Sequence, residues 1–319
     1  MPSWSSLCYL IGFALILAGF SRRLRRAALV GIGILLLTAS VRMSTAASGT
    51  SMTLTTIDEK PARWLGRLID EGDVAVLGAR ILVFARQLHE HDATAVPGAL
   101  GAAYSRMRHE QGDSPSPVLL TWLGLESPGR ADVLVFDDLE RPRGALIFLH
   151  GFSGNFALPC WQIARAAREA GLVTYCPSVG WHGDWWNNPL TLEKTVALVR
   201  RRSHVDRIYL AGLSNGAAGA ARLAPRMRGG FCGMILISGA TRNPASPGVP
   251  VLMLQGRYDA VAPLARAYAT TTGARYVDLD AGHFALLLRE KEANRAITSW
   301  LEERESQCLV SNTAQYPRI

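Results

Sequence analysis

From residue 131 onward, short apolar runs alternate with longer segments in which apolar residues recur at helical spacing. Uninterrupted apolar runs of this kind are typical of strands buried on both faces of a parallel sheet. The predicted strands are 131–136, 143–149, 172–176, 207–211, 233–237, 251–254 and 275–279. The predicted helices are 155–170, 192–202, 215–227, 264–272 and 285–303. Strands that alternate with helices predict an α/β fold with a doubly wound, mainly parallel sheet.

Two uncharged apolar runs, 4–20 and 27–41, lie at the N-terminus on either side of the arginine-rich cluster 22–26. Each is short against the roughly 20 residues that span a bilayer. If both are membrane helices, the arginines stay in the cytoplasm and residues after about 48 lie on the extracytoplasmic side. Alternatively, the arginines begin a signal peptide that is cleaved near 45–47, which would release a secreted or periplasmic protein. Two core helices of a soluble protein fit less well, because adjacent apolar runs with arginines only between them make poor amphipathic helices.

The pattern divides the chain into four expected parts. They are a membrane anchor or signal region (1–47), a helical linker or N-terminal cap (48–130), an α/β domain (131–305) and a C-terminal tail (306–319). In the second part, 61–72 and 73–91 have helical spacing, but nothing in their sequence indicates a function.

The net charge of +8 comes almost entirely from arginine, and outside the N-terminal cluster the arginines are scattered. A basic stripe with interleaved aromatic residues, which nucleic-acid binding would favour, is missing from the sequence. We therefore expect no nucleic-acid partner.

Five cysteines are present, and their spacings match no zinc pattern. His89 and His91 form a His-x-His pair, but no third ligand has sensible spacing, so we expect no metal. If the domain is exported, Cys160 and Cys176 are the favoured disulfide pair; the alternative is buried free thiols.

Candidate chemistry begins where the strand 207–211 meets Gly212-x-Ser214-x-Gly216 and an alanine-rich helix-forming run. Strand, sharp turn and helix form the context of a nucleophile elbow, in which the serine hydroxyl is exposed above the sheet. Glycine on either side of the serine avoids collisions with the neighbouring strand and helix. The N-terminus of the following helix would favour negative charge at the reacting centre.

Two further loops follow predicted strands and carry Asp259 and His283. The carboxyl ends of parallel strands meet at one edge of a sheet, so we expect both side chains near Ser214. A serine hydroxyl needs an adjacent base, and His283 would take its proton while Asp259 fixes the tautomer of the imidazole. Asp278 and Asp280 are the alternatives for the acid, but they lie in or at the end of a strand, where a salt bridge or solvation is common.

From about 131 to 304, just over half of the chain, the sequence resembles the α/β-hydrolases. The resemblance is carried, in order, by His150-Gly151, Gly212-x-Ser214-x-Gly216, Gly256-x-x-Asp259 followed by Val261 and Pro263, and Gly282-His283. It implies the α/β-hydrolase fold, a triad of Ser214, Asp259 and His283, and an oxyanion hole made by the backbone N–H groups of Phe152 and Asn215. For His150 itself we expect a structural role, in which the ring braces loops and transfers no proton.

The sequence departs from many α/β-hydrolases in one respect: only 238–249, rich in proline and glycine, follows the predicted strand 233–237, which corresponds to strand six of that fold, before the strand that leads into the acid loop. We therefore expect no cap insertion there, and any lid must come from 48–130 or 177–190. The second of these segments follows a strand end and holds three tryptophans that either line an acyl or aromatic subsite or cover apolar surface: Trp181, Trp185 and Trp186.

Together these patterns predict a membrane-tethered serine hydrolase that cleaves carboxylic esters through an acyl-enzyme intermediate. The expected substrate is a small-molecule or lipid ester, and no cofactor is implied. Thioesterase, lipase and peptidase activities remain open, because they use the same residues. A non-catalytic binding protein of this fold usually lacks a triad member, and none is missing here. Dehalogenases commonly carry aspartate at the elbow, where this chain has Ser214.

Overall fold

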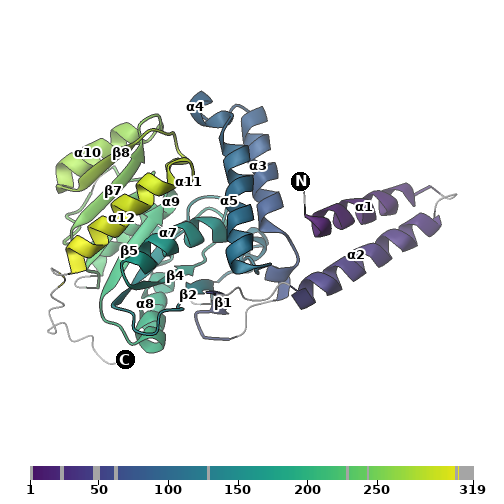
Figure 1. Ribbon diagram of the computed structural model, residues 1–319, viewed down its shortest axis with the longest axis horizontal. Coiled ribbons are helices and arrows are strands. Elements are labelled where there is room, and N and C mark those ends of the chain that lie inside the picture. The colour runs from purple at the N-terminus through teal and green to yellow at the C-terminus, as the bar shows by residue number, and fades with distance from the viewer. Residues whose placement is uncertain are drawn as a thin grey trace.

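A computed structural model describes residues 3–21, 25–45, 51–60, 64–127, 130–227, 230–242, 244–305 and 308. Its centre is an eight-stranded sheet in the order β1-β2-β4-β3-β5-β6-β7-β8 (Figure 1). β2 is antiparallel to both β1 and β4, and all other neighbouring strands are parallel. The strands are β1 (Met52–Thr56), β2 (Asp132–Phe136), β3 (Gly144–Leu149), β4 (Leu172–Pro177), β5 (Ile208–Leu213), β6 (Gly233–Ile237), β7 (Val251–Gly256) and β8 (Arg275–Leu279). The predicted fold class, a mainly parallel α/β sheet of the α/β-hydrolase type, is confirmed.

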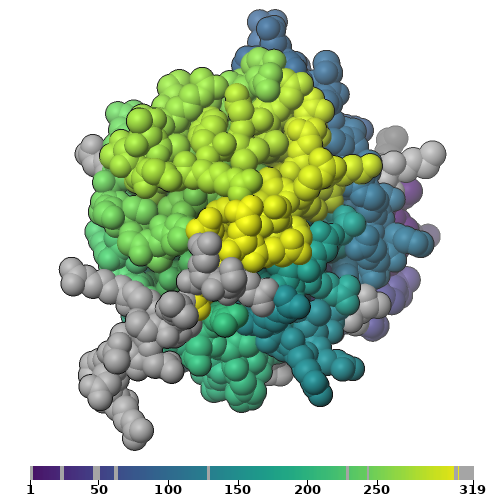
Figure 2. All heavy atoms as spheres, turned by 60° about the vertical axis from the view of Figure 1, so that its left-hand side comes forward, coloured from purple at the N-terminus to yellow at the C-terminus, as the bar shows by residue number. Residues whose placement is uncertain are grey.

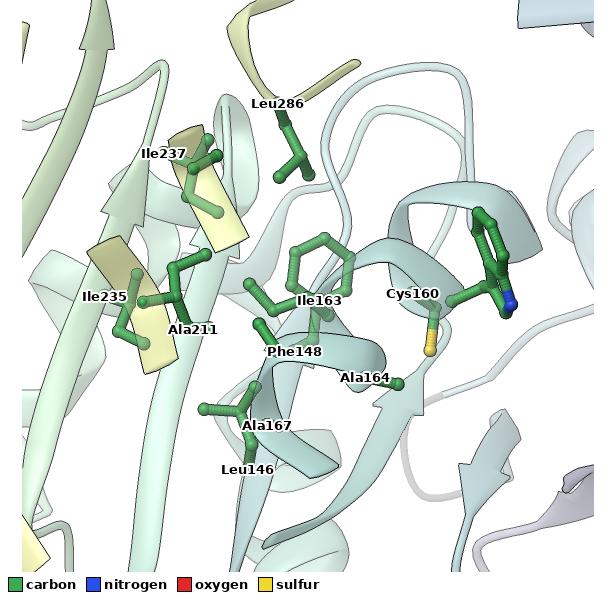
Figure 3. Packing of buried hydrophobic residues seen from close by; sticks show 14 of the residues in the cluster. Leu146, Phe148, Cys160, Ile163, Ala164, Ala167, Ala211, Ile235, Ile237 and Leu286 are labelled. Atoms are coloured by element: carbon green, nitrogen blue, oxygen red, sulfur yellow. The ribbon is translucent and has the colours of Figure 1, made fainter. Parts of the chain in front are cut away.

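Helices cover both faces of the sheet because successive strand residues point to opposite sides. On β3, Leu146 and Phe148 pack with α7 (Ala157–Glu169), whereas Ala145 and Ile147 belong to the core on the opposite face. Figure 3 shows the first of these cores, where Ile163 of α7 lies beside Phe148. α12 (Glu290–Glu305) shares this face with α7, and the two helices adjoin on the surface (Figure 2). The helices of the opposite face are α8 (Pro189–Ser203), α9 (Asn215–Leu223) and α10 (Ala262–Thr272).

The predicted strands and helices from residue 131 onward agree with the structure to within a few residues at each end. Two helices are interrupted where continuous ones were predicted. The elbow helix ends at Leu223 and is followed by the short 3-10 turn η4 (Ala224–Arg226). The closing helix is divided into α11 (Ala285–Leu288) and α12. The described residues between β6 and β7 form bends and irregular loop without a helix.

The N-terminal segment, whose described residues run from 51 to 130, is packed onto the α/β core. β1, which the sequence analysis did not predict, adds an edge strand beside β2. The predicted helical stretch 73–91 is divided into α3 (Glu71–Phe84) and α4 (Glu90–Ala93). Within 61–72 the described part contains only the 3-10 turn η2 (Trp64–Arg67) before α3. The segment is completed by α5 (Val96–Gln111) and α6 (Val118–Trp122).

A buried carboxylate joins this segment to the core. Glu71 accepts hydrogen bonds from the backbone N–H groups of Ala157 at 2.7 Å and Leu158 at 3.3 Å, at the start of α7. It also accepts the hydroxyl of Tyr104 at 2.7 Å and that of Ser116. Burial raises the pKa of Glu71, although these hydrogen bonds act in the opposite direction. The contacts satisfy free N–H groups at the N-terminus of α7, so this segment and the core stabilise each other.

At the N-terminus, α1 (Trp4–Ala18) and α2 (Arg25–Thr45) form a hairpin that projects from the rest of the molecule (Figure 1). The two helices approach closely at Gly12 and Gly31, where a Cβ atom on Gly31 would overlap the Gly12 carbonyl oxygen. α2 is long and apolar enough to cross a membrane or serve as a signal sequence, with a mean hydropathy of 1.8, whereas α1 is shorter.

The base of the hairpin is attached by polar contacts. The Ser3 hydroxyl donates to Asp73 at 2.6 Å. Arg42, buried at the end of α2, pairs with Asp113 and donates to the Ile69 carbonyl at 2.9 Å. Of the predicted N- and C-terminal features, Arg22 to Leu24, the cleavage residues 46–47 and almost all of the tail 306–319 lie outside the described residues.

Two disulfides are formed. The predicted pair Cys160–Cys176 is confirmed, with a Cα–Cα distance of 6.2 Å, and it links α7 to β4. The second, Cys232–Cys308, was not predicted; it links the residue before β6 to the residues after α12. Cys8 in α1 is free.

Candidate active site

Ser214 lies immediately after β5 and caps the N-terminus of α9. Its backbone has φ 54° and ψ −116°, a conformation that a residue with a side chain rarely adopts and that must be held by its surroundings. A Cβ atom on Gly212 would overlap the carbonyl of Gly216, and one on Gly216 would overlap the carbonyl of Leu149. Only glycine fits at these two positions, so the predicted elbow has a direct steric cause.

His283, in the loop after β8, lies between Ser214 and Asp259. Its Nε2 atom is 3.0 Å from Ser214 Oγ, and its Nδ1 atom is 2.8 Å from Asp259 Oδ2. An ionised carboxylate only accepts hydrogen bonds, so Nδ1 carries the proton in the neutral ring and Nε2 can accept the serine hydroxyl. The aspartate side chain is 4% exposed and that of the histidine 42%, so the carboxylate is buried while much of the imidazole remains accessible to solvent.

Asp259 is held by three donors. Besides His283, Gln255 Nε2 donates to Oδ2 at 2.8 Å and the Val261 N–H donates to Oδ1 at 3.2 Å. Burial by itself raises the pKa of Asp259, but the hydrogen bond and charge of His283, together with the other two donors, outweigh it and lower the pKa. The group therefore stays ionised at neutral pH.

The other two candidate acids make different contacts. Asp278 Oδ2 lies 3.6 Å from an Arg266 nitrogen, and Asp280 Oδ2 accepts from Arg289 at 2.9 Å. Both aspartates are well exposed and belong to surface ion pairs. Of the three aspartates, Asp259 is the one that is hydrogen-bonded to His283.

The predicted oxyanion donors belong to two chain segments that meet at Ser214. A Cβ atom on Gly151 would lie 2.9 Å from the Leu213 carbonyl oxygen and 3.1 Å from Ser214 Cβ, so the turn leading to Phe152 rests against the elbow. Asn215 is the first residue of α9, where backbone N–H groups favour negative charge.

His150 is buried and braces these loops, as expected from the sequence. Its Nδ1 lies 2.8 Å from the Gly151 carbonyl, and its Nε2 accepts the Val179 N–H at 3.1 Å. Burial lowers its pKa to about 4, so the ring is neutral at pH 7. Both ring nitrogens are occupied by backbone partners, and the ring is not available to transfer a proton.

The three tryptophans have different environments. Trp185 is fully buried and donates to the His150 carbonyl at 2.9 Å, so the predicted substrate-lining role is wrong for this residue. Trp186 lies under the Arg222 guanidinium, 4.9 Å from the ring centroid. Trp181 is 44% exposed and lies 4.9 Å from the ring of Phe152, which is 52% exposed. Burial of this kind depends on neighbouring elements and leaves no signal in the segment itself.

The sequence analysis missed Asp92. Its carboxylate accepts the Gly282 N–H at 2.8 Å, next to His283 in the chain. No periodicity or motif links 92 to 282. The nearby His-x-His pair faces Tyr258, with His91 stacked on its ring at 4.3 Å. Within the described residues, no group of three or more His, Cys, Asp or Glu side chains is arranged to hold a metal ion.

No protein-family model and no curated protein matches the chain. Among solved structures, Est1E from Butyrivibrio proteoclasticus is similar at 16% identity and a TM-score of 0.47, over 57% of this chain and 97% of Est1E. XC6422 from Xanthomonas campestris, described as an a/b serine hydrolase without lid, is similar at 22% identity and a TM-score of 0.45, over 54% of this chain and 90% of XC6422. A thermophilic esterase from Thermogutta terrifontis is similar at 17% identity and a TM-score of 0.44, over 56% of this chain and 96% of the esterase. These likenesses are too weak to assign a function, which therefore depends on the geometry of the site.

Proposed function

We propose that the protein is a serine hydrolase that cleaves carboxylic esters through an acyl-enzyme intermediate. The observation that supports this proposal is the continuous hydrogen-bonded chain from Ser214 through His283 to Asp259, which begins at a strained elbow. Strain of this kind is maintained where the surrounding structure holds it, and it clusters at functional sites. A protein that only binds a ligand would not need a base within reach of the serine.

In this mechanism, Ser214 Oγ attacks the ester carbonyl carbon while His283 Nε2 takes the hydroxyl proton. The ester C–O bond then breaks, and His283 returns the proton to the departing alcohol. Water attacks the acyl-enzyme in the second half of the reaction, again with His283 as the base. The N–H groups of Phe152 and Asn215 would stabilise the negative oxygen, and loss of one such donor costs about a hundredfold or more in rate.

A fluorophosphonate probe tests the nucleophile directly. We expect the wild-type protein to be labelled and Ser214→Ala to lose labelling with an almost unchanged thermal midpoint. Ser246→Ala is the matched control, because Ser246 is exposed in the loop before β7. Labelling that persists in Ser214→Ala, at another serine, would contradict the assignment.

The same residues would serve a thioesterase, a lipase or a peptidase. A panel of oxygen esters, thioesters and amides with matched acyl groups separates these activities by their kcat/KM values. We expect oxygen esters to be hydrolysed fastest. Labelling without turnover of any substrate in the panel would instead favour a binding protein of this fold.

We further propose that the substrate is a small-molecule or lipid ester with an apolar group that contacts Trp181 and Phe152. Both rings are well exposed and lie together beside the elbow. Trp181→Ala should raise KM for esters with long acyl chains much more than KM for acetate esters. Trp186→Ala is the matched control, because its ring lies under Arg222. Equal effects of the two changes on the acyl-length profile would argue against this subsite.

Finally, we propose that the N-terminal hairpin tethers the hydrolase to a membrane, with the catalytic domain on the extracytoplasmic side. The length and apolar character of α2 support a membrane span, and the two disulfides favour an oxidising compartment. The alternative is a cleaved signal sequence, which would leave a periplasmic or secreted protein. Reporter fusions after residue 48 should be active only outside the cytoplasm, and the mass of the mature chain separates tethering from cleavage.

A further inference from the structure

The short helix α4 (Glu90–Ala93) is far in sequence from the three loops that carry Ser214, Asp259 and His283. In space, α4 and the residues beside it contact the loops of Asp259 and His283. Asp92 is the centre of this contact, with a side chain that is 2% exposed. Its Oδ1 accepts the Gly282 N–H at 2.8 Å, and its Oδ2 lies 3.5 Å from the Phe284 N–H. These two N–H groups flank His283, so one buried carboxylate holds the backbone on both sides of the proposed base.

The fit around Gly282 is close on both sides. A Cβ atom on Gly282 would overlap the Asp92 carboxylate. A Cβ atom on Gly256, at the start of the acid loop, would overlap the Gly282 carbonyl. The histidine loop is therefore held between the acid loop and α4, and its position depends on both.

The same segment also contacts the acid loop. The His91 ring stacks on Tyr258 at 4.3 Å, and His89 lies 5.8 Å from the same ring. Tyr258 precedes Asp259 in the chain, and its N–H donates to the Ala281 carbonyl at 3.1 Å. α4 thus bridges the loop of the proposed acid and the loop of the proposed base at the place where these two loops bond to each other.

A carboxylate is well suited to this contact. Hydrogen bonds from backbone N–H groups to an ionised acceptor are stronger than those between neutral groups. A buried carboxylate is costly unless such donors satisfy it. Removing it would leave the buried Gly282 N–H without its acceptor and free the loop to shift.

We infer that Asp92 is a positioning residue that fixes the His283 backbone, so that the imidazole stays between Ser214 and Asp259. The inference rests on the proposed hydrolase function. Asp92 acts through the loop backbone and does not touch the reacting atoms. The N-terminal segment thereby completes an active site whose proposed catalytic groups all come from residues after 131.

The test compares Asp92→Ala and Asp92→Asn with Asp70→Ala in the full-length protein. Asp70 is the matched control because it is also a buried aspartate of this segment; it accepts the Asp73 N–H at 3.2 Å and pairs with Arg108. With a soluble ester, Asp92→Ala should lower kcat by about 100-fold, the effect of a displacement near 1 Å, with little change in KM. Asp92→Asn keeps an oxygen for the Gly282 N–H and should recover most of the loss. Asp70→Ala should lower the thermal midpoint but leave kcat nearly unchanged.

Hydrogen exchange of residues 279–285 gives a readout that needs no activity. This segment should exchange faster in Asp92→Ala and at the wild-type rate in Asp70→Ala. Unchanged exchange, a wild-type kcat in Asp92→Ala, or an equal loss of kcat in Asp70→Ala would each overturn the positioning role. If the wild-type protein neither turns over esters nor reacts with fluorophosphonate, yet Asp92→Ala still loosens 279–285, the hydrolase proposal fails. The structural contact would then stand without a catalytic role, which also overturns the inference.

Discussion

The substitution Asp259→Asn tests the proposed triad most sharply, because the structure determines which way the new amide must face. The Val261 N–H donates to the Oδ1 position at 3.2 Å, so the amide oxygen belongs there. The NH₂ group then occupies the Oδ2 position, 2.8 Å from both His283 Nδ1 and the Gln255 side chain. Gln255 can accept this arrangement by rotating its amide, since its Oε1 atom has no hydrogen-bond partner among the described residues.

With NH₂ facing Nδ1, the His283 ring must carry its proton on Nε2, where it cannot accept the Ser214 proton. The corresponding change in a serine protease lowers kcat by about 10⁴-fold, and we expect a loss of this order here. It corresponds to about 5.5 kcal/mol of transition-state stabilisation. The fold should survive, because the amide keeps the shape of the carboxylate and both of its polar atoms retain hydrogen-bond partners.

The assay is kcat for a soluble chromogenic ester, measured together with the thermal midpoint. Asp278→Asn is the control, because it makes the same exchange of an oxygen for an NH₂ group but alters an exposed ion pair with Arg266 at 3.6 Å. It should change kcat by less than about threefold. If Asp278→Asn were crippling and Asp259→Asn mild, Asp259 would not be the acid. The loop after β7 would then need a purely structural explanation.

Three further predictions concern the stability of the scaffold. Gly216→Ala should abolish activity and lower the thermal midpoint, because the new methyl group overlaps a backbone carbonyl, whereas Gly180→Ala should be tolerated because nothing lies within 4 Å of its Cβ position; similar midpoints for the two would contradict the steric argument. Replacing Cys160 and Cys176 by alanine should lower the free energy of unfolding by roughly 3 kcal/mol, because the disulfide closes a loop with a sequence separation of 16 residues. Chemical denaturation measures this loss. The buried His150 has a pKa lowered to about 4, so the unfolded chain binds its proton more readily and stability should fall as the pH drops from 6.5 to 4. Denaturation at several pH values should show that the free energy of unfolding falls less steeply with decreasing pH in His150→Asn than in the wild type. An equal dependence on pH in both proteins would refute the assignment of this effect to His150.

Much of the α/β core was predictable because its signals are local. An uninterrupted apolar run marks a doubly buried strand, and β6 begins and ends where the pattern predicts. The edge strand β8, which is mostly exposed or half-buried, also has the predicted bounds. The motif Gly212-x-Ser214-x-Gly216 occupies five consecutive residues, and its glycines meet a steric requirement. The structure shows the collisions that they avoid. The positions of Asp259 and His283 also followed from local patterns, because each loop comes directly after a parallel strand and all such strands end at one edge of the sheet.

Only the tertiary structure decided the contacts between segments that are distant in the chain. β1 joins the sheet through pairing with β2, and nothing within its own five residues specifies that partner. Trp185 is buried, with Gly219 of α9 packed against it, whereas Trp181 is 44% exposed. Asp92 meets Gly282 across 190 residues. Such contacts arise from how helices and loops pack in three dimensions, and no pattern within either segment encodes the identity of its partner.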